Sequence, residues 1–174
     1  SDLYDILAGN RSERLPHVLS PDADDNVFVF WSGHGRYGSL PWGSDNLATA
    51  YELNSTFSKL AKQKKFRQLL FALEACYGGS IGEACNGIPG LLSITAANSS
   101  EPSWAEEKDP DMHIFLSNAF TRTFEETIDE NPEISICNLY YNLARTTNGS
   151  HVSVYNEKQF GNLYKTPMTQ FVKW

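Results

Sequence analysis

The sequence predicts an α/β fold with a mainly parallel sheet flanked by helices. Apolar runs of strand length alternate with stretches whose apolar residues recur at helical spacing. The run at 66–75 is mostly apolar, which is typical of a parallel strand that is buried on both faces. With 174 residues, of which 41% are hydrophobic and 13% aromatic, the chain is long enough for one domain with a substantial core.

A loop, a strand and a helix are predicted for the first part of the chain. Residues 1–25 carry Gly, Asn, Arg, Pro and Asp with little periodicity, so we expect a leading loop. Residues 27–31 form a short apolar strand, and the glycine-rich stretch at 33–43 is longer than a simple connector. Apolar residues at helical spacing then predict an amphipathic helix over about 46–64.

Strands and helices alternate again in the remainder of the chain. In order, we expect a strand at 66–75, a strand at 90–96, a polar loop at 98–111, a helix from 112 to 128, a helix at about 134–146, a strand at 151–156 and an irregular tail. The first of these helices ends at Asn131-Pro132, because proline cannot continue a helix.

Reactive side chains follow two of the predicted strands. The strand at 66–75 runs into Glu-Ala-Cys, ending at Cys76, and the strand at 27–31 runs into Ser-Gly-His-Gly, which contains His34. Because the carboxyl ends of parallel strands meet at one edge of a sheet, we expect the two side chains to lie close together. A thiolate nucleophile needs an imidazole that manages its proton, so the pair predicts a cysteine peptidase. Taken singly, each has a structural interpretation, as a buried packing cysteine and as a turn histidine.

Preorganised donors are also expected beside the nucleophile. The backbone N–H groups of Gly35 and Cys76 suit the developing oxyanion, since glycine lets the backbone approach closely. Trp42 and Trp104 lie in the two long loops; they either form walls of a substrate cleft or are partly exposed packing residues.

Three blocks of sequence resemble the legumain (asparaginyl endopeptidase) family of the caspase-like clan, which also contains gingipains and the catalytic subunit of the GPI transamidase. These blocks are Phe-Val-Phe-Trp-Ser-Gly-His-Gly at 28–35, Leu-Phe-Ala-Leu-Glu-Ala-Cys-Tyr-Gly-Gly-Ser at 70–80 and Ser-Ile-Thr-Ala-Ala-Asn at 93–98. The likeness continues through Asn-Gly-Ser-His-Val at 148–152 and Met-Thr-Gln-Phe at 168–171. The resemblance implies a caspase-like fold and a thioester acyl-enzyme on Cys76.

The resemblance also implies a pocket for the side chain before the scissile bond. Glu74 matches a pocket glutamate of the family, and Ser103 approximately matches another pocket residue. The family's pocket aspartate corresponds to a position near Asn118, where the charge is absent. Gly33 stands where legumains have an aspartate before the histidine. We therefore expect cleavage after Asn, with Lys or Arg as the alternative.

A caspase-like sheet has about six strands, whereas this chain supplies four. The family's first two strands and first helix precede the histidine-bearing strand, where this sequence predicts only the loop at 1–25. We expect a catalytic core at 26–174 that is completed by a separate N-terminal chain of the same precursor. The alternative is a small four-stranded domain that folds alone.

Composition narrows the classes of partner. The net charge of −7 and the pI of about 5.0 argue against nucleic-acid binding. Neither a membrane span nor a signal peptide is visible. No His, Cys or carboxylate cluster has metal-ligand spacing, so no metal or other cofactor is expected. Cys85 and Cys137 either pair in an oxidising compartment or remain as free thiols.

Three functions are consistent with these residues. The first is a peptidase acting on peptide or protein substrates in a secreted, periplasmic, lysosomal or vacuolar setting. The second is a transamidase or ligase of the same clan, which passes the acyl group to an amine. The third is a non-enzymatic binding module, against which the intact Cys76 and His34 argue.

Overall fold

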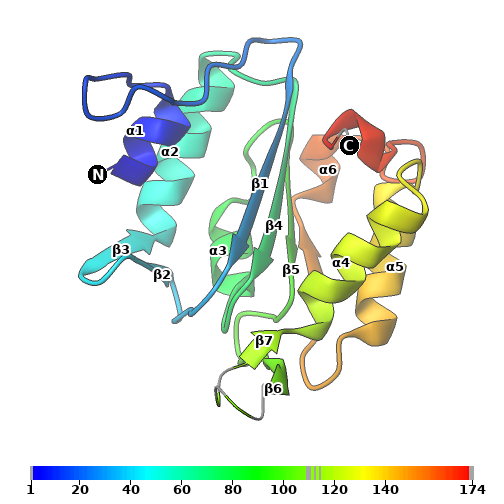
Figure 1. Cartoon of the computed structure of the whole chain (residues 1–174). Helices are drawn as coiled ribbons and strands as arrows, with labels where there is room; N and C mark the ends of the chain where they lie inside the picture. The colour runs from blue at the N-terminus through cyan, green and yellow to red at the C-terminus, as the bar shows by residue number, and fades with distance from the viewer. Residues whose placement is uncertain (1, 109–110, 112, 114, 173–174) are drawn as a thin grey trace.

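A four-stranded sheet in the order β1-β4-β5-β8 forms the centre of the computed structural model, which describes residues 2–108, 111, 113 and 115–172 (Figure 1). β1 (Asn26–Ser32), β4 (Gln68–Glu74) and β5 (Leu91–Thr95) are parallel. β8 (Ser153–Tyr155) pairs antiparallel with β5 at the edge. The predicted α/β fold with a mainly parallel sheet is confirmed.

β4 is buried on both faces, as its apolar sequence predicted. Alternate side chains of a strand point to opposite faces, and six of its seven residues are buried. Leu69, Phe71 and Leu73 belong to one hydrophobic core. Leu70 and Ala72 belong to the other. This central strand therefore holds the two layers of helices together.

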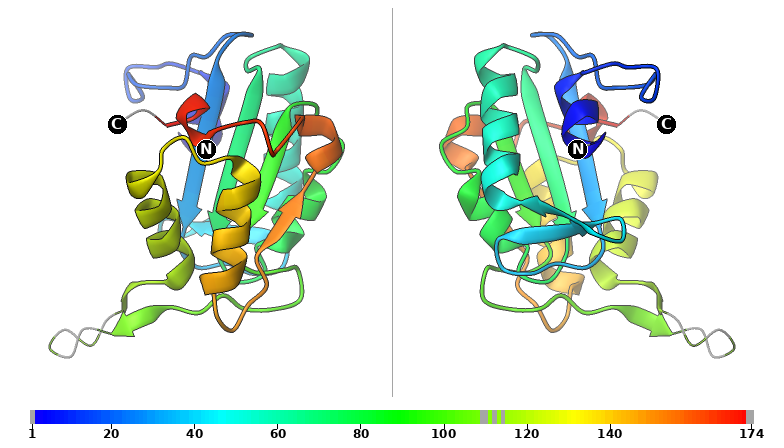
Figure 2. Two further views of the ribbon diagram at one scale, coloured as in Figure 1. Left: turned by 90° about the vertical axis from the view of Figure 1, so that its right-hand side faces the viewer. Right: turned by 90° about the vertical axis from the view of Figure 1, so that its left-hand side faces the viewer.

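One face of the sheet is covered by α1 (Asp2–Ala8), α2 (Ala50–Lys62) and α3 (Gly79–Ala84), and the other by α4 (Ala119–Glu130) and α5 (Ile136–Thr146) (Figures 1 and 2). α2 begins at a capping box formed by Thr49 and Glu52, which satisfies the free N–H groups of its first turn.

Two predicted helices are shorter than expected because hairpins precede them. Before α2, β2 (Ser39–Trp42) pairs antiparallel with β3 (Asn46–Thr49). Before α4, β6 (Glu106–Lys108) pairs with β7 (Phe115–Ser117). The helical spacing within 46–49 and 115–118 is therefore fortuitous, and α4 starts after the Asn118 cap. The predicted helix start at Met112 lies outside the described residues. Its end before Asn131-Pro132 is confirmed.

The leading segment and the tail are not purely irregular, contrary to the prediction. In α1, Leu3 and Leu7 lie one turn apart and are buried in the core that contains α2. That short spacing was obscured by the loop composition of residues 9–25. In the tail, α6 (Glu157–Phe160) follows β8 directly, and a 3-10 helix covers Met168–Gln170.

The outer edge of β1 pairs with no other strand among the described residues, in which β1 pairs only with β4. Phe28, Val29 and Phe30 are only half-buried, although they lie in a strongly apolar strand. A long apolar strand with a free edge is a template for further pairing.

None of the helices in the described part of the chain has the length and apolar character that crossing a membrane requires.

Candidate active site

The candidate site lies at the carboxyl end of the parallel strands, at the bottom of the sheet in Figure 1. The register of β1 and β4 places Ser32 opposite Glu74, the last residue of each strand. The N–H of Gly33 donates to the Glu74 carbonyl at 3.0 Å, which extends the pairing into the loop. The loops that carry His34 and Cys76 therefore leave the sheet side by side.

Gly35 brings the histidine loop into direct contact with Cys76. A Cβ atom at Gly35 would lie 2.2 Å from the Cys76 carbonyl oxygen and 2.9 Å from the Ala75 Cβ. Real Cβ atoms do not approach so closely, so only glycine fits at this position. His34, the preceding residue, is exposed beside the half-buried Cys76.

The thiol itself is held by a different group in this structure. Cys76 Sγ donates to the Ser103 carbonyl oxygen at 3.5 Å. Among the described residues, no hydrogen bond joins the thiol to the His34 imidazole. Because catalytic hydrogen bonds often tighten only when substrate is bound, this geometry is compatible with a dyad.

The two predicted oxyanion donors are free within the described part of the chain. Neither the Gly35 N–H nor the Cys76 N–H donates to any of those residues. The position that a Gly35 Cβ would occupy is 3.1 Å from the Cys76 nitrogen, so the two backbones are in contact. Free amide donors beside a nucleophile are what an oxyanion requires.

A sharp turn follows Cys76. Tyr77 has a φ of 57°, which is uncommon for a residue other than glycine. Its N–H donates to the Glu101 carbonyl at 2.8 Å, and its own carbonyl accepts from Ser80 Oγ at 2.7 Å. These bonds fix the turn and with it the position of the thiol.

Glu74 is buried, with a relative exposure of 7%, and both of its carboxylate oxygens are occupied by serine hydroxyls. Ser103 Oγ donates to one oxygen at 2.7 Å, and Ser32 Oγ donates to the other at 3.0 Å. Ser103 thus contacts both Glu74 and Cys76. The structure brings together the Glu74 and Ser103 of the expected pocket, and it adds Ser32.

Asn118 has a different place. Its side-chain oxygen accepts from the Thr121 N–H at 2.7 Å and caps α4. Its backbone carbonyl accepts from the Arg122 N–H, also within that helix start. In the described residues, Asn118 makes no hydrogen bond to Glu74 or Ser103, so the structure does not join it to the pocket pair.

The two loop tryptophans are held in different ways. Trp42, on the β2–β3 hairpin, packs against Trp31 of β1 with the rings tilted and their centroids 5.4 Å apart. Trp104 is 58% exposed, and its indole N–H donates to the Gly149 carbonyl at 3.1 Å. Trp104 directly follows Ser103, so it lies next to the pocket pair.

The remaining cysteines and histidines take no part in this arrangement. Cys85 and Cys137 are both free thiols: Cys85 is buried in the core on the α2 side of the sheet, and Cys137 lies on α5, which covers the other face. Burial raises the pKa of the Cys85 thiol to about 12, which keeps it inert. His113 is exposed outside any helix, where a helix start was expected. His151 bonds to Glu101.

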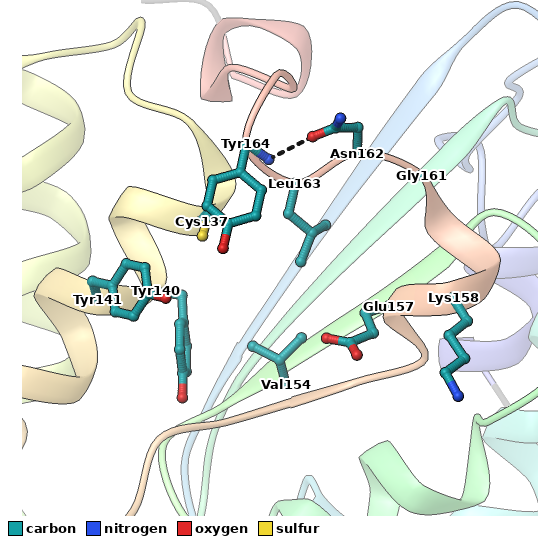
Figure 3. Close-up of a pocket in the computed structure, with 10 residues that line it drawn as sticks. All are labelled: Cys137, Tyr140, Tyr141, Val154, Glu157, Lys158, Gly161, Asn162, Leu163 and Tyr164. Atoms are coloured by element: carbon teal, nitrogen blue, oxygen red, sulfur yellow. Dashed lines mark hydrogen bonds between the residues drawn. The ribbon is translucent and has the colours of Figure 1, made fainter.

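A large pocket lies elsewhere in the molecule. It has a volume of about 800 Å³ and lies between α5, β8 and the segment after α6, where Tyr140, Tyr141 and Tyr164 surround it (Figure 3). None of the predicted site residues lines it. The candidate site residues therefore lie outside this pocket, at the carboxyl edge of the sheet.

The sheet, its two helical layers and the paired loops define a protein of the caspase-like fold. The chain belongs to the Peptidase C13 family, which matches residues 1–170. It is 30% identical to human legumain over 151 residues, or 84% of this chain and 34% of legumain.

Two further relatives extend the range of the family. The delta-isozyme of the Arabidopsis thaliana vacuolar-processing enzyme is 30% identical over 107 residues, or 59% of this chain and 23% of that protein. Bovine GPI-anchor transamidase is 28% identical over 120 residues, or 69% of this chain and 29% of that protein. The chain spans about a third of the length of the curated relatives that it matches. The family supports a cysteine peptidase or transamidase in general.

Proposed function

We propose that this protein is a cysteine endopeptidase of the legumain type, with Cys76 as nucleophile and His34 as its proton carrier. The observation that carries the proposal is the contact of Gly35 with the Cys76 backbone, which leaves room for no side chain. That contact sets the histidine-bearing loop against the thiol at the edge of the sheet where α/β proteins place their chemistry.

In the proposed reaction, His34 takes the thiol proton and Cys76 Sγ attacks the scissile carbonyl carbon. The carbonyl electrons move to oxygen, and the N–H groups of Gly35 and Cys76 stabilise that charge. When the carbon–nitrogen bond breaks, the imidazolium gives its proton to the leaving amine and a thioester remains. Water then attacks the thioester, His34 accepts its proton, and the acid is released as the thiol re-forms.

Glu74 supports a preference for Asn before the scissile bond. An ionised carboxylate has about four lone-pair positions, of which the hydroxyls of Ser32 and Ser103 occupy two. The remaining positions suit an N–H donor, such as the side-chain amide of Asn. A Lys or Arg side chain is the alternative donor. Asn118 caps α4 and its side chain is neutral, so it adds no negative charge that would favour Lys or Arg.

Replacing Glu74 with Gln tests this pocket. The change removes the charge at nearly constant size, so kcat/KM for a peptide with Lys before the cut should fall about 100-fold. The matched Asn peptide should lose only about tenfold, because a neutral amide can still accept one hydrogen bond. Glu125→Gln, at an exposed position of α4, is the charge-matched control. A wild-type preference for large apolar residues in peptide-library profiling would contradict the pocket.

Transfer of the acyl group to an amine is a second candidate reaction. The likeness to GPI-anchor transamidase favours it, and the same thioester serves both outcomes. Analysis of the products in the presence of an added amine nucleophile separates the two, since hydrolysis yields a free acid and transfer yields an amide.

We further propose that an N-terminal part of the same precursor, present as a second chain, adds a strand to the outer edge of β1. The unpaired edge of β1 supports this proposal, as does the incomplete burial of Phe28 and Phe30, whose rings pack on Phe124 at one face of the sheet. The greater length of the relatives leaves ample chain to supply it. By likeness to the vacuolar-processing enzyme, we place the protein in a vacuolar or lysosomal compartment.

The unpaired edge gives a measurable expectation. Residues 1–174 expressed alone should aggregate, because an apolar strand edge is exposed. Mass spectrometry of the active enzyme should detect a second, smaller chain. A soluble, active monomer of 174 residues would contradict this arrangement.

A further inference from the structure

Two loops that are distant in sequence are joined beside the candidate pocket. The loop after β5 carries Ser103 and Trp104, and the segment 149–151 lies just before β8. Four hydrogen bonds join them: Trp104 Nε1 to the Gly149 carbonyl (3.1 Å), Ser150 Oγ to the Ala96 carbonyl (2.7 Å), His151 N to Glu101 Oε1 (2.6 Å) and His151 Nδ1 to Glu101 Oε2 (2.8 Å). The segment before β8 thus supports the loop that forms the pocket.

Glu101 is the central residue of this junction. Its Oε1 accepts from the N–H of His151 and also from the N–H of Asn98, the latter at 3.0 Å. Its backbone carbonyl accepts from the N–H of Tyr77, the residue that follows the nucleophile. One glutamate therefore contacts the turn after Cys76, the end of β5 and the segment before β8.

The carboxylate of Glu101 is only 18% exposed. Burial by itself would raise its pKa, but the hydrogen bonds from Asn98 and His151 outweigh burial and hold the pKa below its ordinary value. Glu101 is therefore ionised at mildly acidic pH, where its hydrogen bonds are charge-assisted.

We infer that Glu101 is a positioning residue for the substrate pocket. Through the loop at 98–104, it holds Ser103 against Glu74 and Cys76, and it holds Trp104 beside them. This inference rests on the proposed function, because it assigns a role in binding the peptide substrate.

The geometry leaves little freedom in this loop. Ser103 uses its hydroxyl on Glu74 and its carbonyl on the Cys76 thiol, so a shift of the loop breaks both contacts. The indole ring of Trp104 packs directly on Gly149. A Cβ atom at residue 149 would lie only 2.9 Å from the ring, so any larger residue would push Trp104 away. Gly149 also has a φ of +81°, which glycine adopts without strain. Displacing the loop therefore alters the pocket while the nucleophile remains present.

Glu101→Ala and Glu101→Gln in the complete protein test this role, with Glu83→Gln as the matched control. Glu83 is an exposed glutamate that bonds Ser99 in the same loop but does not bond His151. For Glu101→Ala, we expect KM for an Asn-containing peptide to rise about tenfold, because a misplaced pocket loses substrate binding. Alkylation of Cys76 by iodoacetamide, which needs no pocket, should stay within about twofold of wild type.

The conservative variant and the control define the remaining outcomes. Gln retains one acceptor oxygen, so KM for Glu101→Gln should rise only about threefold over wild type, which is half of the tenfold rise on a logarithmic scale. It also carries the test if the alanine variant fails to fold. A KM for folded Glu101 variants within about twofold of Glu83→Gln would overturn the inference.

Hydrogen exchange distinguishes this inference from the proposed function. The amides of Asn98 and His151 donate to the Glu101 carboxylate, so their exchange should accelerate in Glu101→Ala and stay unchanged in Glu83→Gln. If wild-type protein cleaves no peptide, the proposed function fails while this measurement still reports on the junction. Unchanged exchange in Glu101→Ala would show that Glu101 does not hold the loop.

Discussion

Cys76→Ala is expected to abolish peptide hydrolysis, with kcat/KM falling by about four orders of magnitude or more. The thiolate is the proposed nucleophile, and no other group at this sheet edge can form the thioester. The side chain is half-buried and its polar contact is to the Ser103 carbonyl, so little packing is lost. Initial rates and a thermal melt of the same preparation measure both expectations.

Cys85→Ala is the matched control for this prediction. Cys85 is fully buried in the core on the α2 side of the sheet, so its replacement leaves a small cavity and lowers the melting temperature. Because it lies outside the site, kcat/KM should remain within about twofold of wild type. Activity that survives in Cys76→Ala, or that is lost on addition of EDTA, would refute the assignment of the nucleophile.

The central sheet could be predicted because its signals are local. The apolar residues of β4, 69–73, each lie in one of the two hydrophobic cores, and the ends of the strand agree with the prediction to within two residues. The stop of α4 before Asn131-Pro132 is likewise encoded in one dipeptide.

The two hairpins depend on pairing between segments, and the sequence around them carries no such signal. In β2, Leu40 is fully buried, but the short strand also contains Pro41, which is unusual inside a sheet. β3 matches the spacing of the helix that follows, so the pattern alone assigns it to that helix. Tertiary pairing decides both cases.

The candidate site likewise contains residues that the sequence predicts and residues that only tertiary contacts bring together. The loops of His34 and Cys76 follow recognisable strands, so their meeting at one edge could be expected from topology. Nothing in the sequence around Ser32 or Glu101 indicates a role in the site. Their partners, Glu74 and His151, are 42 and 50 residues away in the sequence. Only the folded chain brings such pairs together.

Gly35→Ala is expected to lower kcat/KM about 100-fold while leaving the fold intact. The added Cβ would lie 2.2 Å from the Cys76 carbonyl oxygen, which belongs to backbone and cannot rotate away. The loop must therefore move off the nucleophile, and it takes the His34 imidazole and the Gly35 N–H with it. A single methyl group therefore displaces both the proposed proton carrier and one proposed oxyanion donor.

Gly38→Ala in the same loop separates this contact from a general effect of stiffening the loop. Gly38 has a φ of +71°, but no atom lies within 4 Å of the position of its Cβ. Alanine there costs about 1 kcal/mol of backbone strain and meets nothing, so kcat/KM should stay within about threefold of wild type. Measurement of kcat/KM from initial rates, with a thermal melt of each variant, gives the comparison. Equal losses of activity in both would mean that the loop, rather than the contact between Gly35 and Cys76, limits the reaction.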